Sequence, residues 1–149
     1  MSQETMRIEK AVVIDLPPAE LWAFLADLRN DHRWCPKVES VEQVGGDGPG
    51  PDASYRVIHR PIRLKKPKQL AVTVEEFEPP QRMRMREEDD DAVFEVTYEL
   101  HPAKGGTRLT QRDQIAWKIP KFQLPLARRM VSRDIQNQLS ALKRLLEAG

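Results

Sequence analysis

Hydrophobic and polar residues follow a helical period most clearly in residues 122–146, near the end of the chain. The apolar positions of this stripe are Ala127, Val131, Ile135, Leu139, Leu142 and Leu146. Spacings of three and four put them on one face of a helix, with mostly charged and polar residues on the other faces. A helix of about 25 residues would be about 37 Å long. Because its apolar stripe needs a surface to cover, we expect it to pack on a sheet.

Most of the preceding chain alternates between apolar and polar residues, which is typical of strands. Strands are predicted at 6–14, 38–44, 54–62, 69–77, 82–86, 93–100 and 107–119. The segment 82–86 alternates throughout, with methionines on one face and arginines on the other. Short turns rich in glycine, proline and acidic residues separate most of these segments, and such turns favour antiparallel pairing.

Two short helices are predicted between the first two strands. Pro17 and Pro18 precede Glu20 and an apolar helical pattern, so the first helix spans 18–28. A second helical piece covers residues 31–35 and ends at Pro36. The element order predicts an α+β fold, in which a curved antiparallel sheet of six to seven strands wraps around the long C-terminal helix. We expect residues 1–149 to form a single domain.

Composition excludes several classes of protein. The 149 residues include 24 Lys and Arg against 23 Asp and Glu, so no basic excess indicates nucleic-acid binding. No apolar run is long enough to span a membrane, and the first residues lack a signal-peptide core, so we expect a cytoplasmic protein. The single cysteine, Cys35, cannot form an internal disulfide. The histidines and the cysteine lack metal-ligand spacing, so neither a metal nor a cofactor is expected.

The chain resembles the START-like (SRPBCC) helix-grip superfamily, and more nearly its polyketide cyclase/dehydrase and lipid transport branch. The resemblance rests on VVIDLPPAELWAFLADLRNDHRW at 12–34, VTYELHPAKGGTRLTQ at 96–111 and the C-terminal amphipathic helix. It implies a cavity between the long helix and the sheet that holds apolar or amphipathic small molecules. Members also include transporters, cyclases and receptors, and no catalytic motif can be transferred residue by residue.

Gln111 and Asp113 are the main polar candidates. Period two puts them on the face of Leu109, Ile115 and Trp117, which should meet the helix. They could anchor a polar group of a ligand, with Asp113 also able to act as a general acid or base. The alternatives are a bulge that shifts the register, or an arginine partner for Asp113.

His59 shares its face with Tyr55 and Val57 and is either a ligand contact or a hydrogen-bonded core histidine. Trp34 is either a lid over the cavity or a plug at the end of the sheet, and Cys35 has little support as a nucleophile. The basic turn at 60–68 is a candidate membrane or phosphate contact, or a solvated hairpin. The complete set of predicted cavity-lining residues is Trp34, Tyr55, Val57, His59, Met83, Met85, Phe94, Val96, Tyr98, Leu109, Gln111, Asp113, Ile115, Ala127, Val131 and Ile135.

The sequence therefore favours binding of a small hydrophobic or amphipathic ligand, lipid- or polyketide-like, with transport as an extension of that role. One alternative is a cyclase- or dehydratase-type enzyme that uses the polar residues of the cavity. Another is a protein-interaction module related to the lipid-chaperone and ribosome-associated members of the superfamily. Neither a nucleic-acid partner nor a membrane span is expected. The sequence does not decide whether the protein forms a homodimer.

Overall fold

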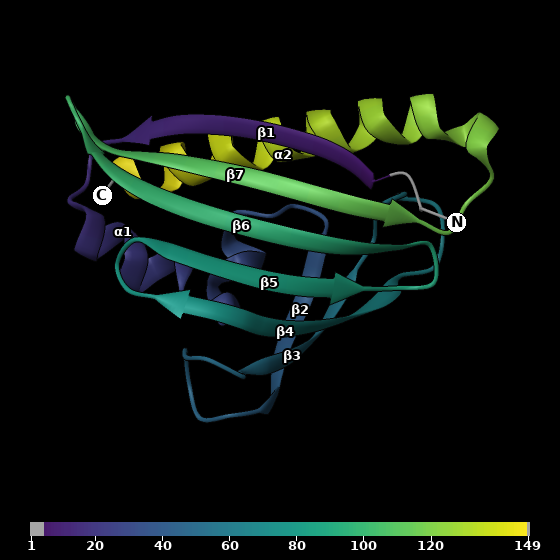
Figure 1. Ribbon diagram of the computed structural model, residues 1–149, viewed down its shortest axis with the longest axis horizontal. Coiled ribbons are helices and arrows are strands. Elements are labelled where there is room, and N and C mark those ends of the chain that lie inside the picture. The colour runs from purple at the N-terminus through teal and green to yellow at the C-terminus, as the bar shows by residue number, and fades with distance from the viewer. Residues whose placement is uncertain (1–4, 149) are drawn as a thin grey trace.

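A computed structural model describes residues 5–148. Seven antiparallel strands form one sheet in the order β1-β7-β6-β5-β4-β3-β2 (Figure 1). The strands are β1 (Thr5–Ile14), β2 (Val38–Gly45), β3 (Ser54–His59), β4 (Lys68–Glu78), β5 (Arg82–Glu88), β6 (Ala92–Ala103) and β7 (Gly106–Trp117). The predicted helix-grip architecture is confirmed. No helix among the described residues is long and apolar enough to cross a membrane.

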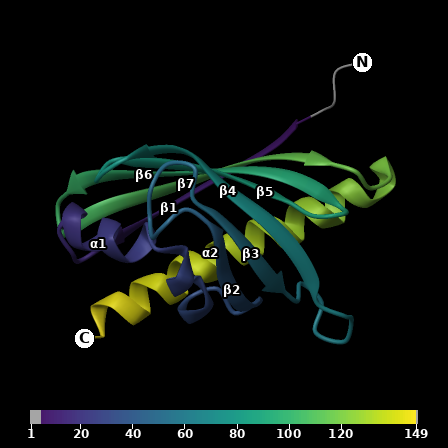
Figure 2. The same cartoon turned by 90° about the horizontal axis from the view of Figure 1, so that it is seen from below.

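The long helix α2 (Leu124–Glu147) runs along the concave side of the sheet (Figure 2). A short 3-10 turn, η2 (Lys121–Gln123), precedes it. Ile135, Leu139 and Leu142 are buried against the sheet, as the apolar stripe predicts. Leu146 packs on the same core but remains partly exposed near the helix end.

The connection between β1 and β2 contains α1 (Pro18–Leu25) and the 3-10 helix η1 (Leu28–Arg33). The first helix is therefore shorter than the predicted 18–28. Asp27 adopts an extended backbone, and its side chain accepts a hydrogen bond from the backbone N–H of Arg29. Because this contact caps a new helical segment, α1 cannot continue through Asp27.

Other strand boundaries also differ from the sequence-based prediction. β3 ends at His59 rather than at residue 62, since Pro61 has no N–H to offer the sheet. β7 ends at Trp117, shortly before Pro120. β5 continues through residues 87 and 88, which were predicted to form an acidic turn. This extension places Glu87 on the inner face, in the same alternation as Met85.

The β6–β7 hairpin is tied closely to the end of β1. Gly106 has a φ of 130°, and a Cβ atom there would collide with the carbonyl oxygen of Ile14. Thr107 Oγ1 donates a hydrogen bond of 2.6 Å to the carbonyl oxygen of Leu16. β7 then pairs with β1 and β6 without a register shift, so the side chains of its inner face point toward α2 along the strand.

Candidate functional site

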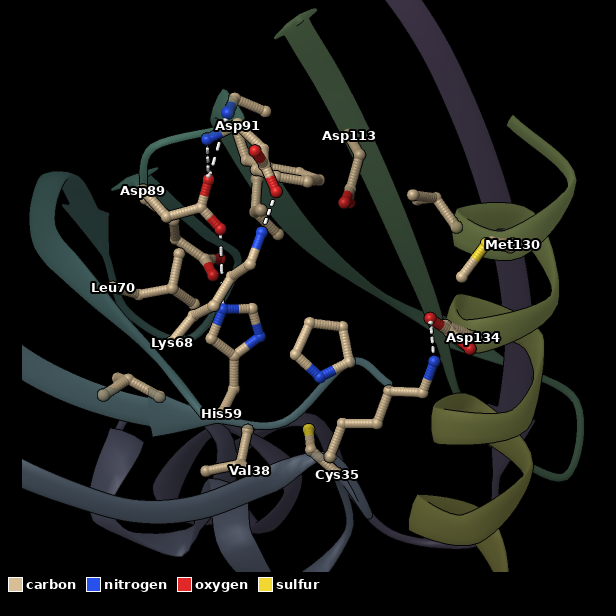
Figure 3. Close-up of a pocket in the computed structure, with 18 of the residues that line it drawn as sticks. Cys35, Val38, His59, Lys68, Leu70, Asp89, Asp91, Asp113, Met130 and Asp134 are labelled. Atoms are coloured by element: carbon tan, nitrogen blue, oxygen red, sulfur yellow. Dashed lines mark hydrogen bonds and ion pairs between the residues drawn. The ribbon is translucent and has the colours of Figure 1, made fainter. Parts of the chain in front are cut away.

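A cavity of about 730 Å³ lies between α2 and the inner face of the sheet. Its wall comes from β3 to β7, from the segment around η1 and from the first half of α2 (Figure 3). Farther along the helix, Leu139 and Leu142 are fully buried, and there the hydrophobic core fills the space between α2 and the sheet. The volume is within the range of small-molecule binding sites.

Apolar side chains form much of this wall. Met85, Phe94 and Val96 project from β5 and β6, and Val131 and Ile135 face them from α2. Phe94 also packs edge-on against a tryptophan ring of β7, at a centroid distance of 5.8 Å. The arrangement offers a ligand a hydrocarbon surface on two opposite sides.

Gln111 and Asp113 are the most deeply buried polar residues of the wall, each 4% exposed. Gln111 Nε2 donates a hydrogen bond of 3.0 Å to Asp113 Oδ1. Gln111 Oε1 is buried and has no hydrogen-bond partner among the described residues. Burial raises the pKa of Asp113 to about 7, although the hydrogen bond from Gln111 opposes the shift. Of the two alternatives for Asp113, neither a register shift nor an arginine partner is found among residues 5–148.

Glu87 and Asp31 bring two further carboxyl groups to the cavity. Burial raises the pKa of Glu87 to about 8, and the negative charges of Asp113 and Asp89 contribute to the rise. Burial also raises the pKa of Asp31 well above its usual value, with a smaller contribution from Glu87. Both side chains are partly exposed, and both line the cavity. The interior is therefore acidic and poorly solvated.

Ion pairs surround this interior at the rim (Figure 3). Lys37 Nζ lies 2.8 Å from Asp134 Oδ2 and joins the start of β2 to α2. His59 Nε2 lies 3.5 Å from Asp89 Oδ2. A third pair connects Lys68 of β4 to Asp91, in the turn before β6.

Exposed apolar residues flank the opening of the cavity. Ile62, in the loop after β3, and Leu126, in the first turn of α2, line the cavity and remain exposed. Leu64 and Phe122 lie two and four residues from them in the chain and are 96% and 81% exposed. Lys65 and Lys66 add positive charge on the same loop. An amphipathic molecule would meet both apolar and charged groups here.

The structure brings most of the predicted site residues together around the cavity. Those that line it are Val57, His59, Met85, Phe94, Val96, Tyr98, Gln111, Asp113, Ala127, Val131 and Ile135. They come from four strands and one helix, as the alternation along each element predicts. Their contact with a ligand stays a prediction.

The remaining predicted residues are placed in the core, away from the cavity wall. These residues are Trp34, Tyr55, Met83, Leu109 and Ile115. The four strand residues among them are on the inner side of the sheet, as predicted, but like Trp34 they are buried and do not line the cavity. Trp34, for example, lies behind Tyr98, with ring centroids 6.4 Å apart. Sequence alternation identifies the face, but not how far along the strand the cavity extends.

Sequence reasoning missed the carboxyl groups of Asp31 and Glu87 and the ion pairs of the rim. For Glu87 a signal existed, because period two continues from Met83 through Met85 to Glu87. Asp31 lies in a 3-10 helix, and Asp134 pairs with Lys37 across 97 residues of chain. For these residues the local sequence pattern does not indicate where the side chain points.

The described residues contain no group of three or more His, Cys, Asp or Glu side chains arranged to hold a metal ion. Cys35 lines the cavity, but burial raises the pKa of its thiol well above the usual value. A thiol in that state is a poor nucleophile. What the cavity offers chemically is an apolar wall, several carboxyl groups and one unpartnered amide oxygen.

The chain matches one family of known proteins and several solved structures. The sequence model of the family described as polyketide cyclase/dehydrase and lipid transport matches residues 5–147. No curated protein sequence matches the chain. A protein from Thermus thermophilus is 22% identical, with a TM-score of 0.77 over 97% of this chain and 98% of its own.

Two other solved structures share the fold at lower identity. A START superfamily protein from Mycobacterium smegmatis is 13% identical, with a TM-score of 0.79 over 95% of this chain and 97% of its own. BexL, a di-domain ARO/CYC protein from the BE-7585A biosynthetic pathway, is 15% identical with a TM-score of 0.78. That match covers 99% of this chain and 52% of BexL, so this chain spans about half of the larger protein.

Proposed function

The chain belongs to the polyketide cyclase/dehydrase and lipid transport family, and on this premise we propose that it binds a small hydrophobic or amphipathic molecule in the cavity under α2. The observation that carries the proposal is the cavity itself, with about 730 Å³ of space lined by Met85, Phe94, Val96 and Val131. A well-packed core does not leave such a space empty. A lipid- or polyketide-like molecule has the size and the apolar surface to occupy it.

The affinity would come mainly from burying hydrocarbon. Each buried methylene group contributes about 0.8 kcal/mol, before the cost of ordering the ligand. Polar residues would then set the orientation. Gln111 and Asp113 lie on the β7 side of the cavity and His59 at the rim, so the cavity offers two positions for a polar group of the ligand.

A homologous series of linear alcohols tests the proposal. Isothermal titration calorimetry from hexanol to dodecanol should show the affinity rising about fourfold for each added methylene group, until the cavity is filled. Ala127→Trp/Val131→Trp, which places indoles on the cavity wall, should abolish binding. The matched control, Arg128→Trp/Arg133→Trp, places the same side chains on the exposed face of α2 and should bind like the unmodified protein. Binding that ignores chain length, or that survives the first variant, would contradict the proposal.

Proton transfer to a bound ligand is a second candidate function. Asp113 and Glu87 face the cavity, and their pKa values of about 7 and about 8 allow each to exchange a proton near neutral pH. Cyclisation or dehydration of a polyketide chain needs such an exchange beside a carbonyl group. Asp113→Asn should then keep the affinity for a poly-β-ketone but lose its conversion, followed by mass spectrometry. Equal conversion by both proteins would exclude Asp113 as the acid or base.

A further inference from the structure

The inner wall of the cavity presents a buried hydrogen-bond acceptor that no donor among the described residues reaches. Gln111 donates an amide N–H to Asp113, and its Oε1 atom is buried and has no partner among the described residues. An amide oxygen accepts hydrogen bonds and cannot donate them. Since nearly all buried polar groups in proteins are satisfied, this atom points to a ligand that brings a donor.

The carboxyl groups beside Gln111 also lack a cation. Two lysines of the rim pair with other acids, Lys37 with Asp134 and Lys68 with Asp91, and His59 lies beside Asp89. Lys65 and Lys66 lie on the exposed loop at the opening. Within residues 5–148, no ion pair reaches the inner carboxyl groups of Asp31, Glu87 and Asp113. A buried carboxyl group without a cation beside it keeps its proton to a higher pH, so a ligand that brings a positive charge would favour the ionised form.

We infer that the ligand carries a protonated amine, whose ammonium group lies against Asp113, Glu87 and Gln111 Oε1 while its apolar body lies against α2. The inference rests on the proposed binding function and specifies its ligand class. An ammonium group has three N–H donors and one positive charge, so it can satisfy the amide oxygen and the carboxylates together. The hydrocarbon would extend from there along Met85 and Val131.

Other ligand chemistries satisfy fewer of these groups. A fatty acid with its carboxylate at Lys65 and Lys66 of the opening would place hydrocarbon against the inner carboxyl groups and leave them without a cation. A ketone could accept a hydrogen bond from a protonated Asp113, but it offers no donor to Gln111 Oε1. A metal ion is not favoured, because the described residues form no cluster suited to one.

Binding of a cation should release protons. Asp113 and Glu87 have pKa values of about 7 and about 8, raised first by burial. Beyond burial, the negative charges of Asp113 and Asp89 raise the pKa of Glu87, whereas the hydrogen bond from Gln111 lowers that of Asp113. An ammonium group would favour the ionised forms, so a carboxyl group that is protonated in the free protein loses its proton on binding. An alkylamine, like a lysine side chain, stays charged throughout this range.

Three ligands of equal length separate this inference from the proposed function: n-decylamine, n-decanol and n-decanoic acid. Calorimetry at pH 8 should give the amine at least about tenfold higher affinity than the alcohol, and this advantage should shrink by pH 5.5. At pH 7, titrations in two buffers of different ionisation enthalpy should show proton release for the amine and none for the alcohol.

Variants test whether the inner carboxyl groups cause the preference for the amine. Asp113→Asn and Glu87→Gln should each lower the affinity for decylamine and reduce the proton release, so that the advantage of decylamine over decanol shrinks in both variants. The matched control is Asp91→Asn, which removes a carboxylate from the rim and should keep the preference for the amine.

The outcomes are distinct. If decanol or decanoic acid binds as tightly as decylamine, the inference is wrong while the proposed function stands. If none of the three ligands binds, the proposed function is wrong as well. If decylamine is preferred but Asp113→Asn and Glu87→Gln do not change its affinity, the ammonium group lies elsewhere and the inference is again overturned.

Discussion

Replacing Asp113 by asparagine should stabilise the protein, by an amount that grows with pH. The carboxyl group has a pKa of about 7 in the folded protein, against an ordinary value of 3.8, because burial disfavours its charge. Between these values the folded protein holds a proton that the unfolded chain has lost, so the free energy of unfolding falls as the pH rises. The asparagine side chain does not titrate and would avoid this loss.

The two pKa values set the magnitude of this stabilisation. A difference of about three pKa units, at 1.36 kcal/mol per unit, corresponds to about 4 kcal/mol once both states are ionised. Relaxation and water in the cavity make this an upper limit. The variant should therefore match the unmodified protein near pH 4 and exceed it by up to about 4 kcal/mol at pH 8.5. For a domain of this size that is up to about 8 to 16 °C in Tm.

Urea denaturation followed by tryptophan fluorescence, at several values between pH 4 and pH 8.5, measures the difference. Asp89→Asn is the control with the opposite sign. Burial tends to raise the pKa of Asp89, but the neighbouring His59 and the backbone N–H of Ala92 outweigh it, so the pKa is lowered. This variant should be less stable than the unmodified protein at pH 7, and the difference should vanish as the pH falls below 4. A constant difference for Asp113→Asn at every pH would refute the assignment of a desolvated carboxyl group.

Three further predictions concern the frame of the cavity. Leu139→Ala should lower the free energy of unfolding, measured with urea, by about 2 to 5 kcal/mol, because this side chain is fully buried between α2 and the sheet. A loss below about 1 kcal/mol would show that the buried face of α2 is assigned incorrectly. Gly106→Ala should be severely destabilising, since its Cβ would collide with the carbonyl of Ile14, whereas Gly48→Ala, also at positive φ but with open space, should cost only about 1 kcal/mol in thermal unfolding. Cys35 should react with a disulfide reagent at pH 8 only after denaturation, because burial raises the pKa of its thiol; rapid reaction of the folded protein would show that the thiol is accessible.

The sequence predicted the architecture well, because the fold depends on periodicities that local residues carry. The stripe of α2 shows which positions are buried, and it also separates Leu139 and Leu142, which fill the core, from Val131 and Ile135, which line the cavity. The strand faces were equally readable, since side chains alternate between the two faces along each strand.

The chemistry of the site was only partly readable, because it depends on contacts between distant segments. Gln111 and Asp113 stood out as polar residues on an apolar face. Glu87 was hidden in an acidic run that resembles a turn, although β5 in fact extends through it. Asp31 reaches the cavity from a 3-10 helix, whose direction only the packing of the whole fold determines.

The most direct test of the account locates a ligand in the cavity by NMR. Unlabelled n-decanol is bound to ¹³C-labelled protein, and isotope-filtered nuclear Overhauser effects then report which protein methyl groups touch it. We expect contacts from the ligand chain to the methyl groups of Met85, Val96, Val131 and Ile135, and none to Val44 on the outside of the molecule. Contacts confined to exposed methyl groups such as those of Val44 or Leu64, or no contacts at all at saturating ligand, would contradict it.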